Sequence, residues 1–165
     1  MLYALAVVFL VAVDQAVKFL VRANIPLGES IPFLPHVMNL TFVQNTGAAF
    51  SLFREHTWLL TLVSAAASAV LAVVLWKRLF ITHPLGRWPL AVILAGAVGN
   101  LIDRAALGYV TDMFQTTFIR FAVFNVADIC VVCGGIALVA YVLFGWERLE
   151  KRGDGHEQAD ADRPV

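Results

Sequence analysis

Four long apolar runs constrain the fold of this chain more than any other feature of its sequence. They are Leu2–Val21, Thr57–Trp76, Trp88–Leu107 and Asn125–Trp146, and each has about the 20 residues that a helix needs to cross a bilayer. Apolar residues make up 60% of the chain and charged residues 15%, whereas ordinary soluble domains have about 45–50% and about 25%. We therefore expect an all-α membrane protein built as a bundle of four transmembrane helices. A soluble enzyme, a disordered chain and a disulfide scaffold are excluded.

Basic residues are distributed unevenly among the connections between these runs. Seven lie in the loop Lys77–Arg87 or in the C-terminal tail, whereas the connections on the other side hold three. Because cytoplasmic loops carry the excess of Lys and Arg, both termini are predicted to be cytoplasmic. We expect one integral-membrane domain, residues 1–146, followed by a polar and mobile cytoplasmic tail, residues 147–165.

The connection Arg22–His56 is predicted to lie outside the cytoplasm and to contain a small β-structure. Three prolines exclude a long helix in its first half. The stretch Val37–Val43 is rich in β-formers and roughly alternates between apolar and polar residues, which predicts a short sheet between the first two spans. Gly47 and the two alanines after it leave a backbone that another chain can approach closely, and relief of a tight turn is the alternative interpretation of these small residues.

Polar side chains within the apolar runs concentrate in one predicted layer of the membrane. Asp14 and Lys18 lie four residues apart, which is the spacing of an ion pair on one helix face. The other members lie at the outer end of the third run, in the loop after it and at the start of the fourth run: Asn100, Asp103, Arg104, Asp112, Asn125 and Asp128. Ionisable groups at such depth are costly and mark function. Because consecutive spans run in opposite directions, we expect these residues to converge, while the span Thr57–Trp76 supplies packing surface.

Asp112 and Asp128 are the strongest candidates for catalytic residues, because no basic residue nearby in sequence is an evident ion-pair partner of both. Two carboxyl groups that share a half-buried site do not easily both ionise, so they are expected to share one proton. Such a pair supplies a general base and a general acid in one place. For Asp14, Lys18 and the pair Asp103–Arg104, bracing of the bundle is the alternative to contact with a substrate.

Other chemistries have weaker support in the sequence. The four histidines are scattered over loops on both sides and no H-E-x-x-H occurs, so no metal site is expected. Cys130 and Cys133 have C-x-x-C spacing within an apolar run, where small core residues are the simplest interpretation. No phosphate loop or basic patch predicts a nucleic-acid partner. A small ion transporter or channel subunit and a structural scaffold remain as alternatives.

Five short motifs resemble the bacterial lipoprotein signal peptidase family, also called signal peptidase II. They match in order along the chain: Asp14–Lys18 is similar to D-x-x-x-K, Asn45–Phe50 to N-x-G-A-A-F, Gly99–Arg104 to G-N-x-x-D-R, Val110–Phe114 to V-x-D-x-F and Phe124–Asp128 to F-N-x-A-D. Each motif alone is weak, but five in order on four spans make a specific resemblance. The chain departs from the family in its short N-terminus without the usual basic residues and in Met113, which stands where an aliphatic residue is common.

The resemblance implies an aspartyl endopeptidase of the bacterial inner membrane with its active site near the periplasmic face. Its substrates would be prolipoproteins that carry diacylglycerol, cut on the N-terminal side of the lipidated cysteine, and membrane lipid would be its other partner. Asp112 and Asp128 would be the catalytic pair, without a metal or cofactor, and we expect the protein to act as a monomer. The residues implied to bind substrate or support the site are Asp14, Lys18, Asn45, Gly47, Asn100, Asp103, Arg104, Asn125 and Ala127.

Overall fold

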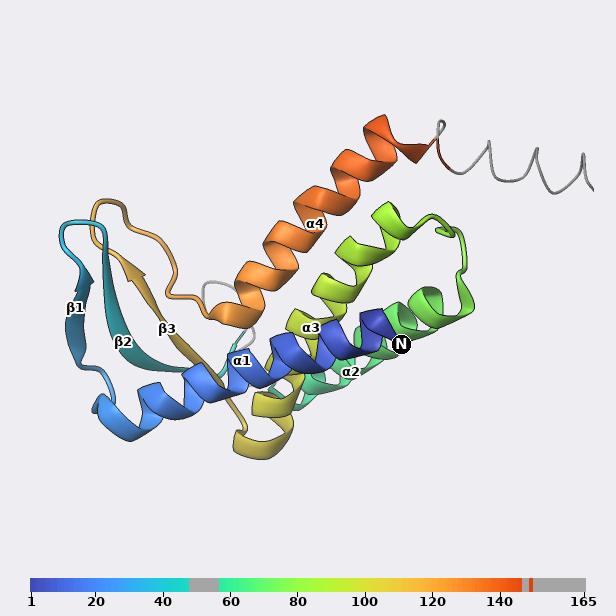
Figure 1. Ribbon diagram of the computed structural model, residues 1–165. Coiled ribbons are helices and arrows are strands. Elements are labelled where there is room, and N and C mark those ends of the chain that lie inside the picture. Colours follow the sequence, from blue (N-terminus) through green and yellow to red (C-terminus); the bar gives the residue numbers. More distant parts are fainter. Residues whose placement is uncertain (48–56, 147–148, 150–165) are drawn as a thin grey trace, which may run out of the picture.

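The computed structural model describes residues 1–47, 57–146 and 149 as four helices and a three-stranded sheet (Figure 1). In chain order the elements are α1 (Leu2–Asn24), β1 (Ser30–Leu34), β2 (Met38–Asn45), α2 (Thr57–Lys77), α3 (Pro84–Leu107), β3 (Val110–Thr116) and α4 (Val126–Phe144). Apart from Leu149, the predicted tail lies outside the described residues, as do the two alanines after Gly47.

All four helices are long and apolar enough to cross a membrane, which confirms the predicted fold class. In the most hydrophobic window of each helix, between 11% and 39% of the residues are buried inside the protein. Most apolar side chains therefore face outward, as expected where the solvent is lipid. The helix bounds differ from the predicted spans by a few residues: α1 continues to Asn24, α3 begins at Pro84 and α4 ends at Phe144.

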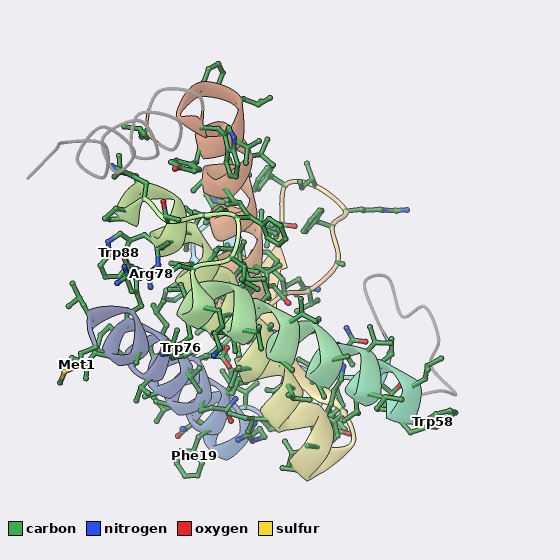
Figure 2. The ribbon with its side chains drawn as sticks, turned by 90° about the vertical axis from the view of Figure 1, so that its right-hand side faces the viewer. Met1, Phe19, Trp58, Trp76, Arg78 and Trp88 are labelled. Atoms are coloured by element: carbon green, nitrogen blue, oxygen red, sulfur yellow. The ribbon has the colours of Figure 1, made fainter. Side chains whose placement is uncertain are left out.

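Tryptophan side chains mark both ends of the bundle (Figure 2). Trp58 lies at the start of α2, whereas Trp76 at its end and Trp88 early in α3 lie toward the opposite end of the bundle. All three side chains are at least 36% exposed. Because Trp is enriched at the two membrane–water interfaces, this arrangement fits helices that cross the bilayer from end to end.

Helix α3 is the centre of the bundle, since it packs against each of the other three helices. It begins with His83 as its N-cap and Pro84 in its first turn, and it ends at Gly108, whose φ of 78° is left-handed. Glycines on α3 allow the close packing. A Cβ at Gly99 would lie 2.6 Å from Oδ2 of Asp14, and one at Gly96 would overlap the carbonyl oxygen of Ala127.

The sheet lies beyond the C-terminal end of α1 and beside the start of α4 (Figure 1). Its order is β1-β2-β3, and both neighbouring pairs are antiparallel. The prediction of a sheet between the first two spans is confirmed for β1 and β2, whereas the loop predicted around Asp112 is wrong because this segment is strand β3. The register places Asp112 opposite Val43 and Val110 opposite Asn45, so that the two strands bring Asn45 and Asp112 together.

Candidate active site

A network of polar side chains connects α1, α3, β2, β3 and the start of α4 at the end of the bundle that carries the sheet. The convergence predicted from the alternating direction of the spans is present in the structure. The network includes Asp14, Lys18, Asn45, Asn100, Asp103, Asp112, Asn125 and Asp128.

Lys18 is at the centre of the buried part of this network. Its Nζ lies 3.0 Å from Oδ2 of Asp14 and 3.3 Å from Oδ2 of Asp103, and all three side chains are at most 2% exposed. Nζ also donates a hydrogen bond of 3.0 Å to Oδ1 of Asn100 and a longer one of 3.4 Å to the carbonyl oxygen of Gly99. The predicted ion pair of Asp14 and Lys18 is therefore present, and Asp103 extends it across to α3.

Asp112 lies in the buried first half of β3 and is held by two side-chain amides. Asn45 at the end of β2 donates from Nδ2 to its Oδ2 at 3.0 Å, and Asn125 donates from Nδ2 to its Oδ1 at 2.7 Å. Burial raises the pKa of Asp112 from its ordinary value of 3.8 to about 6. The two amide donors and the charge of Lys18 oppose this rise, whereas the nearby charge of Asp128 adds to it.

Asp128 lies in the first turn of α4 and forms a reciprocal capping box with Asn125. Oδ1 of Asn125 accepts the N–H of Asp128 at 2.9 Å, while the N–H of Asn125 donates to Oδ2 of Asp128 at 3.1 Å. Asn100 on α3 donates from Nδ2 to Oδ1 of Asp128 at 2.8 Å. The same Asn100 accepts hydrogen bonds at its Oδ1 from Lys18 and Asn125, which fixes the orientation of its amide. The carboxylate therefore receives donors on both oxygens, at a helix end that favours negative charge.

Asp112 and Asp128 line the same cavity, whose volume is about 460 Å³. Asn45, Asn100 and Arg104 complete the polar part of its wall. The remaining wall is mainly apolar and comes from the start of β3, the connection between β3 and α4, and α4 itself: Val110, Phe121, Ala122, Val123, Phe124, Ile129, Val131, Val132 and Cys133. A cavity with two carboxyls at one side and apolar residues at the other suits a substrate that is part peptide and part hydrocarbon.

Arg104 and Asp103 are neighbours in sequence, but their side chains have different surroundings. Asp103 binds Lys18 on α1, whereas Arg104 lines the cavity. Nε of Arg104 is buried and has no hydrogen-bond partner among residues 1–47, 57–146 and 149, and its Nη1 makes two contacts of 3.5 Å, to Ser64 and to the carbonyl oxygen of Asn100. Asp103 therefore joins α3 to α1, as the bracing alternative expects, whereas Arg104 faces the cavity. The second predicted span forms α2 and was expected only to supply packing surface. Its Ser64 accepts the contact from Nη1 of Arg104 at the edge of the site.

The structure adds three residues that were not singled out from the sequence. Gln15 donates from Nε2 to Oδ1 of Asp103 at 3.2 Å and to the carbonyl oxygen of Gly99 at 3.1 Å. Arg22 donates from Nη1 to the hydroxyl of Thr111 at 2.9 Å. Gln15 could have been found from the sequence, because it is a polar residue between Asp14 and Lys18 in an apolar run. No sequence signal pointed to Thr111, because its role depends on the fold of β3.

Among the described residues, no group of three His, Cys, Asp or Glu side chains has an arrangement that could hold a metal ion. Cys130 is a buried free thiol and Cys133 an exposed one.

Gly47, the last described residue before α2, donates its N–H to Oδ1 of Asn45 at 3.0 Å and so supports the amide that binds Asp112.

Comparisons with known proteins agree with this fold and show the family to which the chain is similar. The family model described as signal peptidase (SPase) II matches residues 6–144. A lipoprotein signal peptidase of Streptococcus pyogenes strain Manfredo is 41% identical over 142 residues, which cover 84% of this chain and 90% of the relative. A bacterial membrane enzyme solved by the in meso method at 2.3 Å resolution superposes with a TM-score of 0.80 at 26% identity, over 86% of this chain and 87% of that one. A second such structure, at 1.9 Å, gives a TM-score of 0.78 at 26% identity, over 87% of this chain and 93% of that one.

Proposed function

Because the chain belongs to the signal peptidase II family, we propose that it is an aspartic endopeptidase acting on prolipoproteins that already carry diacylglycerol. The family and the four membrane-length helices make it a bacterial inner membrane protease that removes signal peptides from lipoproteins. The cut that we propose is on the N-terminal side of the lipidated cysteine. Asp112 and Asp128 are the proposed catalytic pair.

One observation carries this proposal more than any other: two carboxyls from separate elements, Asp112 on β3 and Asp128 on α4, line one half-apolar cavity. The pKa of Asp112, which burial raises to about 6, supports a pair that holds one proton at mildly acidic pH. We assign this proton to Asp112, because burial disfavours the ionised form of its carboxyl group.

In the proposed reaction, a water molecule between the two carboxyls is the nucleophile. The ionised Asp128 takes a proton from this water as its oxygen attacks the scissile carbonyl carbon, and Asp112 donates its proton to the carbonyl oxygen. The tetrahedral diol then collapses: the C–N bond breaks, Asp128 gives its proton to the leaving nitrogen and Asp112 recovers one from the diol. Acid–base help of this kind is typically worth about 10²- to 10⁴-fold, and positioning adds to it.

The lipid on the substrate provides binding energy in this proposal. Each buried CH₂ group contributes roughly 0.8 kcal/mol, so two acyl chains can supply much of the affinity. Residues of α4 such as Val132, which is 58% exposed, form the apolar side of the cavity and are open to lipid. Arg104, whose Nε lacks a partner in the described part of the chain, is placed to bind peptide carbonyl or lipid ester oxygens.

The proposed orientation follows the positive-inside rule, with both termini cytoplasmic and the sheet at the periplasmic face. The basic residues of the α2–α3 connection support it, because they lie at the end of the bundle opposite the candidate site. This places the reacting groups in the outer leaflet, where the acyl chains of a prolipoprotein would hold its cleavage site. All residues of the network come from one chain, so we propose that the monomer is active.

Two forms of one prolipoprotein, with and without diacylglycerol on its cysteine, test this function in detergent or proteoliposomes. We expect cleavage at one site in both, with kcat/KM lower by about 100-fold or more for the form without lipid, since hydrocarbon burial is lost. Equal rates for the two forms would contradict recognition through lipid. Mass spectrometry of the products checks the position of the cut.

A further inference from the structure

The residue before Asp112 is anchored by a buried carboxylate. The N–H of Thr111 donates to Oδ2 of Asp103 at 2.9 Å, and both residues are at most 1% exposed. Water therefore does not compete for this bond. Since Thr111 directly precedes Asp112 in β3, the position of Asp103 on α3 determines where the Asp112 backbone lies.

The residue before Asp128 is anchored in the same way, by a different helix. The N–H of Ala127 donates to Oδ1 of Asp14 at 2.9 Å, and both residues are at most 1% exposed. Gly99 leaves room for this contact, because a Cβ there would lie 2.6 Å from Oδ2 of Asp14 and 3.2 Å from Cβ of Ala127. The position of Asp14 on α1 therefore determines where the first turn of α4 lies.

Lys18 joins these two anchors. Its Nζ binds Oδ2 of Asp14 at 3.0 Å and Oδ2 of Asp103 at 3.3 Å, and the lysine side chain is fully buried. In a buried site such charge-assisted contacts are short and strong, and removal of one partner leaves uncompensated charge. The ammonium group of Lys18 is thus the charged link between the two carboxylates that fix the backbone before each member of the dyad. The Gln15 amide is a neutral second link, since its Nε2 donates to Oδ2 of Asp14 at 3.1 Å and to Oδ1 of Asp103 at 3.2 Å.

We propose that Lys18 is a positioning residue, which sets the separation of the Asp112 and Asp128 carboxyls by holding Asp14 and Asp103 together. This inference rests on the proposed function. It assigns Lys18 a role in the rate of the chemical step that differs from bracing the bundle. The role has a clear kinetic consequence, because a misplacement of about 1 Å can lower a rate by about 100-fold without weakening substrate binding.

Two variants separate positioning from charge neutralisation. Lys18→Met removes the charged link, and among the described residues Asp103 keeps only Nη1 of Arg22, at 4.0 Å, as a cationic partner. Lys18→Met combined with Asp14→Asn removes the same link but restores the original formal charge of the cluster, and the Asn oxygen can still accept the N–H of Ala127. Both variants are assayed with the lipidated prolipoprotein, and kcat is expressed per folded molecule, counted by binding of an uncleavable lipidated peptide.

We expect the double variant to recover folded yield but not rate, with kcat lower by about 30-fold or more and KM within about threefold of the natural chain. A kcat within threefold of the natural chain in the double variant would overturn the proposal, because charge balance alone would then explain Lys18. Failure of both variants to fold would also overturn it, since the role of Lys18 would be stability.

Leu75→Ala is the matched control for buried packing at the other end of the bundle, where Leu75 is 1% exposed. It should lower folded yield and leave kcat per folded molecule unchanged. Asp112→Asn, measured in parallel, tells the two proposals apart. If it cleaves, the proposed function fails; if it is inactive while the double variant keeps its rate, only the positioning role fails.

Discussion

Asn125 donates a hydrogen bond of 2.7 Å from Nδ2 to Oδ1 of Asp112, so the cap of α4 holds a carboxyl group of β3. The other side of the same amide caps the helix, because Oδ1 accepts the N–H of Asp128 at 2.9 Å. Asn125 is fully buried. One side chain therefore links the two proposed catalytic residues, and its two functions can be separated by substitution.

Asn125→Ser is predicted to keep the helix cap and lose the amide donor. Ser is about as good an N-cap as Asn, so the free energy of unfolding should change less than in Asn125→Ala, where loss of the cap costs about 0.5–2 kcal/mol. Cleavage should fall by about tenfold or more in both variants, because Asp112 loses its 2.7 Å partner. Thermal unfolding and kcat/KM, measured together, check this. Natural activity in Asn125→Ser would contradict a role for the amide.

The dependence of activity on pH follows from the raised pKa of Asp112. If the dyad works with one proton, kcat/KM should be highest below the pKa of about 6 and should fall about tenfold per pH unit above it, as Asp112 ionises. Asn45 lowers this pKa through its hydrogen bond, so Asn45→Ala is predicted to move the inflection to higher pH.

The control for this profile is Gln44→Ala, which removes an exposed amide from the preceding position of β2. It should leave the inflection where it is in the natural chain. A profile that moves to lower pH in Asn45→Ala would show that the hydrogen bond does not stabilise the Asp112 carboxylate.

Two glycine substitutions test the close packing beneath the site. A Cβ at Gly99 would lie 2.6 Å from Asp14, so Gly99→Ala should lower the free energy of unfolding by roughly 1–3 kcal/mol. Gly135 in α4 has nothing within 4 Å of the corresponding position, so Gly135→Ala should be neutral or stabilising by up to about 1 kcal/mol. Thermal unfolding in detergent compares them. Equal stability of the two variants would contradict the tight contact of α1 with α3.

The sequence was sufficient to predict the helices and much of the polar network, for identifiable physical reasons. A membrane helix must satisfy its backbone internally and present apolar side chains to lipid, so hydropathy alone located all four helices. Charged residues in such helices must face the interior, so Asp14, Lys18 and Asp103 could be expected to meet. Because consecutive spans run in opposite directions, the sequence also predicted that these residues lie in one layer of the membrane.

Strand β3 could not be predicted in the same way. Its first four residues, Val110–Met113, are all buried, so the alternation of apolar and polar residues that marks a half-buried strand is absent. The strand exists because β2 pairs with it, which is a contact between distant parts of the chain. Gln15 and Thr111 acquire their partners only once helices and strands have packed. The different surroundings of the Asp103 and Arg104 side chains likewise depend on which elements pack against each of them.

Cleavage of a lipidated prolipoprotein by Asp128→Asn, compared with the natural chain at pH 6, tests the central claim most directly. Glu29→Gln is the matched control, since it makes the same change at an exposed position between α1 and β1. We predict that Asp128→Asn folds, binds the substrate and loses activity by about 10²- to 10⁴-fold, whereas Glu29→Gln keeps it. Turnover by Asp128→Asn within threefold of the natural rate would contradict catalysis by the Asp112–Asp128 pair.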